Sequence, residues 1–252
     1  MMEKQIRITV LIIVLFFPMA CSNSSEDQSE ILITQVESQI LVFSKTEGFR
    51  HGSIEAGQEA VRRLGMENNI QVHITEDASS FSEEVLSGMD AVVFLNTTGT
   101  ILDENQKAAF KNYIRNGGGY VGVHSATDTE YEWPWYNRLV GAYFKNHPRV
   151  QSAVLEIVDP NHASTSMLPE LWEREDEWYN FRDMNEDVQV LIKIDTDSFE
   201  GSEHPGSHPM AWYHEYDGGR AFYTALGHTE ESYIEELFLR HLLGGIEYAM
   251  GK

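Results

Sequence analysis

The sequence predicts a single α/β domain, a three-layer sandwich in which helices cover both faces of a mostly parallel central sheet. Two observations indicate this class. From about residue 39 onward, short apolar runs rich in β-branched residues alternate with amphipathic helical segments. The same stretch has no internal repeat and no low-complexity break, and its roughly 210 residues suffice for one sizeable hydrophobic core.

The first half of the domain is expected to supply the parallel strands. Apolar runs predict strands at residues 40–43, 70–75, 91–95 and 120–123, separated by helices at 53–64, 83–87 and 104–115. Ser53 is a suitable N-cap for the first helix. In sheets built this way, ligands bind beyond the carboxyl ends of the strands.

The segment 103–127 is the most informative part of the chain. Asp103 as N-cap with Gln106 three residues later predicts a capping box, and an Asn-Gly pair ends the helix. Three glycines then lead into a short strand that ends on His124, where a sharp turn would present one reactive side chain. The glycines match G-x-G-x-x-G, but they precede a strand instead of following one, which excludes a dinucleotide site.

The second half is expected to extend the sheet. Apolar runs predict strands at 153–158 and 188–194, and a hairpin is expected between 210–214 and 221–226 because Asp-Gly-Gly separates them. A last helix at 230–248 should pack as a lid on the sheet, since its apolar stripe comprises Leu237, His241, Leu242 and Ile246.

The N-terminus has the pattern of a targeting signal. Residues 1–20 join two basic residues to an apolar run too short for a comfortable membrane span, which is typical of a signal peptide. Cys21, the only cysteine, resembles the lipidated residue of bacterial lipoproteins. Residues 21–38 would then be a lipidated polar tether and 39–252 the domain, held in the cell envelope on the periplasmic or surface face of the outer membrane. The alternative is an uncleaved anchor with a structural cysteine.

The net negative charge of the chain limits which molecules it can bind. The chain has a formal charge of −22, which repels phosphate backbones and anionic lipid headgroups, so nucleic-acid binding is excluded and a neutral ligand is expected. With Cys21 lipidated, the domain retains no thiol for a disulfide, a metal site or nucleophilic attack. The composition does not predict an oligomeric state.

Polar candidates follow three of the predicted strands. Arg50 and His51 lie in the loop after the first strand, Asn96 follows the third, and His124 and Ser125 follow the fourth. His124 could act as a general base because imidazole titrates near neutrality, or it could be a buried histidine that fixes the turn. His51 could likewise be a solvent-exposed loop residue, and Ser125 is a weak candidate nucleophile.

Several motifs in order resemble one family. The helix, glycine turn, strand and Gly-Val-His-Ser-Ala turn are similar to the ThuA-like (trehalose utilisation) family, and so are Arg50-His51, Asp176-Glu177-Trp178-Tyr179 and the segments 208–212 and 219–228. The resemblance implies a class I glutamine amidotransferase-like, flavodoxin-like fold. In those amidotransferases the strand end carries a catalytic cysteine. His124 stands there in this chain, so thiolate chemistry is excluded.

The resemblance also implies a substrate class. ThuA-like proteins are associated with trehalose and related disaccharides oxidised to 3-keto sugars, so we expect a neutral disaccharide or 3-keto-glycoside and acid/base isomerisation or cleavage. Strand-end positions and family motifs together give candidate catalytic residues His124, His51, Glu177 and His228, and candidate substrate-binding residues Arg50, Ser125, Asn96, Tyr179, Trp212 and Arg220. Arg50 would clamp the ketone oxygen.

Two alternatives remain open from the sequence. One is a non-catalytic lipoprotein that binds sugar with the same aromatic residues. The other is zinc-assisted hydrolysis, since neutral imidazoles bind zinc and five histidines could converge: His51, His124, His208, His214 and His228. No H-E-x-x-H pair is present, so no cofactor is expected and zinc is the lesser possibility.

Overall fold

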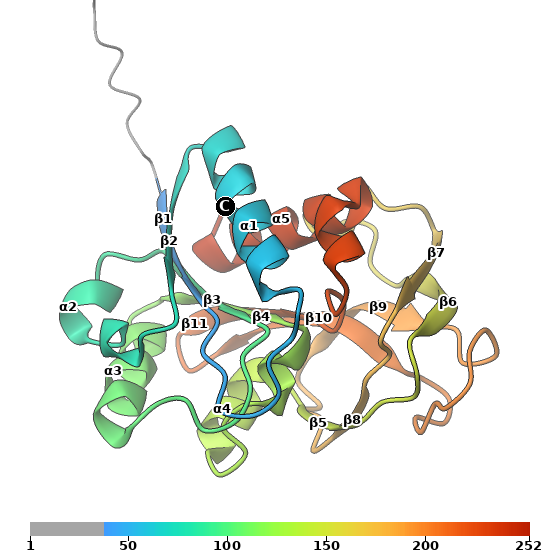
Figure 1. Ribbon diagram of the computed structural model, residues 1–252, viewed down its shortest axis with the longest axis horizontal. Coiled ribbons are helices and arrows are strands. Elements are labelled where there is room, and N and C mark those ends of the chain that lie inside the picture. The colour runs from blue at the N-terminus through green and yellow to red at the C-terminus, as the bar shows by residue number, and fades with distance from the viewer. Residues whose placement is uncertain (1–37) are drawn as a thin grey trace, which may run out of the picture. The chain divides into compact units, whose positions relative to one another are not determined.

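A computed structural model describes residues 38–252 (Figure 1). Its main feature is a nine-stranded sheet in the order β2-β1-β3-β4-β11-β10-β9-β6-β7. The first five strands of that order run parallel to one another: β2 (Ile70–Thr75), β1 (Ser38–Phe43), β3 (Ala91–Leu95), β4 (Gly119–Val123) and β11 (Gly219–Thr224). The other four are antiparallel to their neighbours: β10 (Pro209–Tyr216), β9 (Gln189–Ile194), β6 (Gln151–Ile157) and β7 (Leu171–Asp176).

Helices cover both faces of this sheet. In Figure 1, α1 (Ile54–Glu67) and α5 (Glu236–Met250) lie on one side, while α3 (Glu104–Arg115) and α4 (Pro134–Val140) lie on the other, with the short α2 (Glu83–Leu86) beside α3. A small second sheet pairs β5 (Tyr143–Asn146) with β8 (Asn180–Arg182). The predicted α/β sandwich is confirmed, and its sheet is mixed. Among residues 38–252, no helix is long and apolar enough to cross a membrane.

Local signals locate several elements correctly. α3 begins with a full capping box, in which Asp103 accepts the Gln106 N–H and the Gln106 side chain accepts the Asp103 N–H. β10 and β11 form the expected hairpin around Asp217-Gly218. The predicted signal peptide and Cys21 lie outside the described residues, and Ser38, assigned to the tether, is the first residue of β1.

Tertiary contacts modify two helix starts. Ser53 occupies the N-cap position of α1 as predicted, but its hydroxyl donates to the Gly227 carbonyl and makes no capping hydrogen bond. The last helix does not begin at residue 230. A 3-10 turn, η3 (Glu230–Ile234), comes first, and Glu235 then adopts an extended backbone while its carboxylate accepts the Trp172 indole N–H. α5 therefore begins at Glu236.

The direction of β7 determines what reaches the edge of the sheet. Four successive antiparallel pairings lead from β11 to β7, so β7 runs in the same direction as β11 and the other parallel strands. Its carboxyl end therefore points to the same edge. Asp176, the last residue of β7, accepts hydrogen bonds from the N–H groups of Gly227 and His228. The end of β7 thus lies against the loop after β11, although three strands separate the two in the sheet.

Candidate active site

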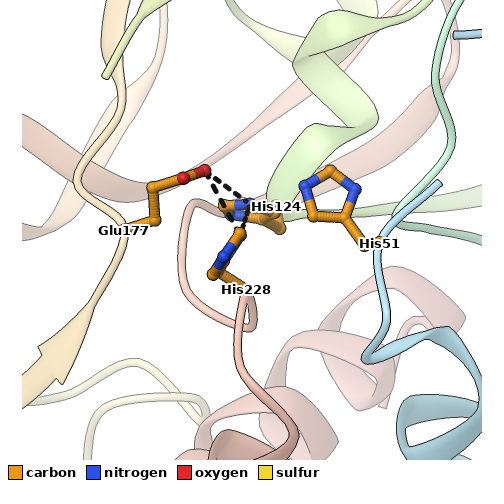
Figure 2. Close-up of side chains that lie close together, drawn as sticks. All are labelled: His51, His124, Glu177 and His228. Atoms are coloured by element: carbon orange, nitrogen blue, oxygen red, sulfur yellow. Dashed lines mark hydrogen bonds and ion pairs between the residues drawn. The ribbon is translucent and has the colours of Figure 1, made fainter. Parts of the chain in front are cut away.

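Four strand ends bring their side chains to one place at this edge (Figure 2). His51 lies in the loop after β1, His124 follows β4, Glu177 follows β7 and His228 lies in the loop after β11. One nitrogen or oxygen from each lies within 4.8 Å of the others. We refer to these four residues as the His/Glu cluster. All four are sequence candidates, and the structure brings them together.

His124 is held in a fixed orientation. Its backbone φ of 49° is in the left-handed region, which a non-glycine residue adopts at a cost and which is common at functional turns. The side chain is fully buried, and its Nδ1 lies 2.8 Å from the Ala225 carbonyl oxygen. Because a carbonyl only accepts, Nδ1 carries the proton. The lone pair of Nε2 therefore faces the cluster.

His228 lies between two acceptors. Its Nδ1 is 3.2 Å from His124 Nε2 and 3.2 Å from Glu177 Oε2. One proton on Nδ1 satisfies this arrangement. Burial opposes the imidazolium, but the hydrogen bond to Glu177 outweighs it and raises the pKa of His228 above its usual value.

Glu177 uses its two oxygens differently. Oε2 faces His228 and His124, at 3.5 Å from His124 Nε2, while Oε1 lies 3.0 Å from Nδ1 of His147. Burial opposes the carboxylate, yet His124 and His228 hold the pKa of Glu177 well below its usual range. Glu177 is therefore an anion that counters the imidazoles around it.

His51 completes the cluster as a neutral base. Its side chain is buried, and its Nδ1 lies 3.3 Å from the Ser125 hydroxyl. Figure 2 shows the other ring nitrogen pointing toward His124. Burial, together with the nearby His124 and His228, lowers the pKa of His51 to about 3. An uncharged imidazole at neutral pH can accept a proton from a bound molecule.

Asp176 connects the segments that carry the cluster. It is fully buried, and its Oδ1 accepts the backbone N–H of Glu177 at 2.9 Å and that of His228 at 3.2 Å. Its Oδ2 accepts the Gly227 N–H at 3.0 Å and pairs with Arg174 at 3.1 Å. Asp176 thus ends β7 and holds two site loops together.

A pocket of about 350 Å³ opens onto three members of the cluster, His51, Glu177 and His228. That volume lies at the lower end of the range for small-molecule sites. The remaining lining residues are Phe49, Asp128, Phe144, His147 and Tyr179. Phe144 and Tyr179 lie with ring centroids 4.3 Å apart, so the pocket presents aromatic surface beside the imidazoles.

The other candidate residues near the edge have separate roles. Tyr179 lines the pocket and packs against His124 at 4.2 Å between ring centroids. Ser125 contacts His51. Asn96 is buried, and its amide donates to the Ser53 hydroxyl and the Gly227 carbonyl, so it supports the loops and does not line the pocket. Arg50 turns outward, where its guanidinium pairs with two surface carboxylates, Glu55 and Glu76.

Two candidates from the later motifs lie away from the pocket. Trp212 is a core residue whose indole donates to the Val140 carbonyl and whose ring packs on Tyr223. Arg220 pairs with Gly119 at the starts of β11 and β4, which is the edge opposite His228. Neither is placed to touch a ligand in this pocket.

His147 and Phe144 are pocket residues that the sequence did not single out. Phe144 lies on β5 of the small second sheet, and His147 lies in the turn after it. The sequence candidates, in contrast, came from the ends of the parallel strands and from the family motifs. Asp128 lies in the loop after β4 and accepts the Tyr131 hydroxyl. An Asn-His-Pro sequence directly after a short strand was the available signal for His147.

Comparison with known proteins agrees with this architecture. The family model described as ThuA, trehalose utilisation, matches residues 39–249. A ThuA-like protein from Bacteroides uniformis superimposes with a TM-score of 0.71 at 21% identity, covering 84% of this chain and 91% of that one. A ThuA-like protein from Parabacteroides merdae gives 0.67 at 22%, with 85% and 91% covered. At these identities the structural likeness establishes the fold. No curated protein matches the sequence.

Proposed function

The chain belongs to the ThuA family, and from this premise we propose that it is an enzyme that acts on a neutral disaccharide or 3-keto-glycoside by acid/base chemistry. Family membership supports a place in carbohydrate metabolism. The observation that carries the chemical part is the His/Glu cluster, in which His51, His228 and the Glu177 carboxylate share the edge of a single pocket.

The cluster suits a substrate whose C3 carbonyl acidifies the C2 proton. His51 would take that proton, and the electron pair would form the C1=C2 double bond as the C1–O bond breaks. His228 would donate its proton to the departing oxygen. Isomerisation would use the same base and return the proton to a different carbon. Arg50 has no part in this scheme, because its guanidinium is engaged by Glu55 and Glu76.

The rest of the pocket favours an uncharged sugar. The aromatic rings of Phe144 and Tyr179 offer flat apolar surfaces, on which sugar rings commonly pack. The Glu177 carboxylate and the formal charge of −22 disfavour anionic ligands such as nucleic acid. The proposed partner is therefore a neutral disaccharide or its 3-keto derivative.

The test is turnover of 3-keto-trehalose beside unoxidised trehalose, followed by proton NMR in D₂O. We expect consumption of the keto sugar only, with loss of its C2 proton signal and deuterium at C2 of the keto sugar that remains. His51→Asn should lower kcat by a factor of ~10² or more, the usual contribution of a general base. Arg50→Gln is the control, since it removes a neighbouring charge outside the pocket, and it should retain wild-type turnover. Sugar binding without exchange or turnover would instead identify a non-catalytic sugar-binding protein.

We also propose that Cys21 anchors the protein in the cell envelope. Acylation at this thiol would be the membrane attachment that remains after cleavage of a signal peptide. The full-length wild type should incorporate labelled fatty acid and fractionate with membranes, whereas Cys21→Ser should do neither. Ser22→Ala, a change beside the cysteine, should behave as wild type. Absence of label from the wild type would contradict the lipoprotein assignment.

A further inference from the structure

Three ligand-type atoms of the His/Glu cluster form a nearly regular triangle. His124 Nε2 and His228 Nδ1 are 3.2 Å apart, His228 Nδ1 and Glu177 Oε2 are 3.2 Å apart, and Glu177 Oε2 and His124 Nε2 are 3.5 Å apart. Zinc bonds nitrogen and oxygen at about 2.0–2.2 Å, which places the ligand atoms of a tetrahedral ion about 3.3–3.6 Å apart. The triangle has the dimensions of one face of that tetrahedron.

These three atoms face one another across 3.2–3.5 Å. His124 Nε2 is unprotonated because Nδ1 donates to the Ala225 carbonyl. Glu177 is a carboxylate, so Oε2 is an acceptor. Two acceptors, His124 Nε2 and Glu177 Oε2, therefore face His228 Nδ1, and one positively charged group between the three atoms satisfies both acceptors. A proton on His228 Nδ1 can fill that role, and so can a metal ion that replaces the proton.

Outer contacts orient these groups as they do in metal sites. Metal-bound histidines commonly donate their second N–H to a carbonyl, and bound carboxylates are hydrogen-bonded in turn. His124 donates to Ala225, and Glu177 Oε1 is held by His147 Nδ1. His147 Nδ1 also lies 2.8 Å from the Pro148 carbonyl oxygen, so it carries a proton and acts as a donor.

A second histidine pair in the chain lacks these properties. The rings of His204 and His208 are 4.4 Å apart. His204 Nε2 accepts the Phe181 N–H, His208 Nε2 donates to the Tyr179 carbonyl, and His208 Nδ1 contacts the Ser202 hydroxyl. Three of the four ring nitrogens are thus engaged within the fold, and among residues 38–252 no carboxylate completes a ligand set with this pair.

From this geometry we infer that the His/Glu cluster binds one divalent first-row transition metal ion. Its ligands are His124 Nε2, His228 Nδ1 and Glu177 Oε2. Two histidines, one carboxylate and an open position are the ligand set of catalytic zinc sites. His51 lies beside this set, since its ligand atom lies within 4.8 Å of the others. A metal here would take the place of the His228 Nδ1 proton, so in the metal-bound protein the ion, and not His228, would polarise the ketone or leaving oxygen beside the neutral His51.

Metal content tests this inference without any substrate, so its outcome is separate from that of the proposed reaction. The untagged full-length protein is stripped with a chelator, equilibrated with Zn²⁺ or Mn²⁺, and analysed by elemental mass spectrometry and calorimetry. We expect one ion per chain. His228→Asn and Glu177→Gln should weaken binding more than 100-fold, and His147→Asn by the ~10–100-fold that loss of an outer partner costs. His204→Asn, which changes the second histidine pair, should bind as wild type.

Cobalt gives an independent readout of the ligand set. Co²⁺ in the wild type should give the strong visible absorption of a tetrahedral ion, and His228→Asn should lose it while its circular dichroism stays unchanged. The inference is overturned if neither zinc nor manganese binds stoichiometrically. It is also overturned if His204→Asn removes the ion as effectively as His228→Asn does, because the ion would then lie elsewhere.

Discussion

Asp176→Ala is expected to lower the free energy of unfolding by about 3–5 kcal/mol, the usual cost of removing one partner from a buried ion pair. Asp176 is fully buried and pairs with Arg174, whose side chain is 4% exposed. Nε and Nη1 of Arg174 already lack hydrogen-bond partners. Without Asp176, the one carboxylate of residues 38–252 that would still pair with this buried cation is Glu235, at 3.4 Å. Urea denaturation followed by circular dichroism measures the loss.

The same substitution should also disturb the site. The carboxylate of Asp176 accepts the N–H groups of Glu177, Gly227 and His228, so its loss frees both loops that carry the cluster. Glu175→Ala is the matched control, because Glu175 precedes Asp176 on β7 but points to solvent. Its effect should stay within about 0.5 kcal/mol, as for most surface substitutions. Equal effects of the two variants would refute the role assigned to Asp176.

The elements predicted correctly from sequence are those with strong local signals. The capping box begins α3 as expected, and the Asp-Gly turn joins β10 to β11. Regular alternation also located the parallel strands, which is why His51 and His124 could be placed after strand ends at one edge of the sheet. These inferences depend on a few neighbouring residues and on the rule that parallel strands end at the same edge.

Long-range pairing accounts for what the sequence did not reveal. Glu177 reaches the cluster only because four antiparallel pairings return β7 to the direction of β11. The hydrophobic periodicity of a sequence does not indicate the order in which strands pair within a sheet. Arg220 and His228 belong to one sequence motif, yet they lie near opposite ends of the same strand and thus at opposite edges. Arg50 lies after β1, one of the strands that end at the site, but its side chain turns outward because it pairs with the carboxylates of Glu55 and Glu76.

His124→Asn is expected to lower turnover of a 3-keto-glycoside by ~10² or more while the fold is retained. Asparagine tolerates the left-handed backbone that His124 adopts at φ 49° better than most residues do. Its amide can also replace Nδ1 as the donor to the Ala225 carbonyl. What it cannot replace is Nε2, the atom that faces His228 and Glu177. The substitution therefore removes the group at the centre of the cluster and keeps the one that stabilises the turn.

A second buried histidine provides the control for this experiment. His241 is also fully buried, and its Nδ1 likewise donates to a backbone carbonyl, that of Ser164, but it lies on α5 outside the cluster. His241→Asn should leave turnover unchanged. For His124→Asn we expect a melting temperature within about 4 °C of wild type, the shift that ~1 kcal/mol produces in a domain of this size. A large drop in melting temperature with wild-type turnover of the remaining folded protein would show that His124 only fixes the turn. Loss of the Nε2 that contacts His228 and Glu177 would otherwise lower the rate of every folded molecule.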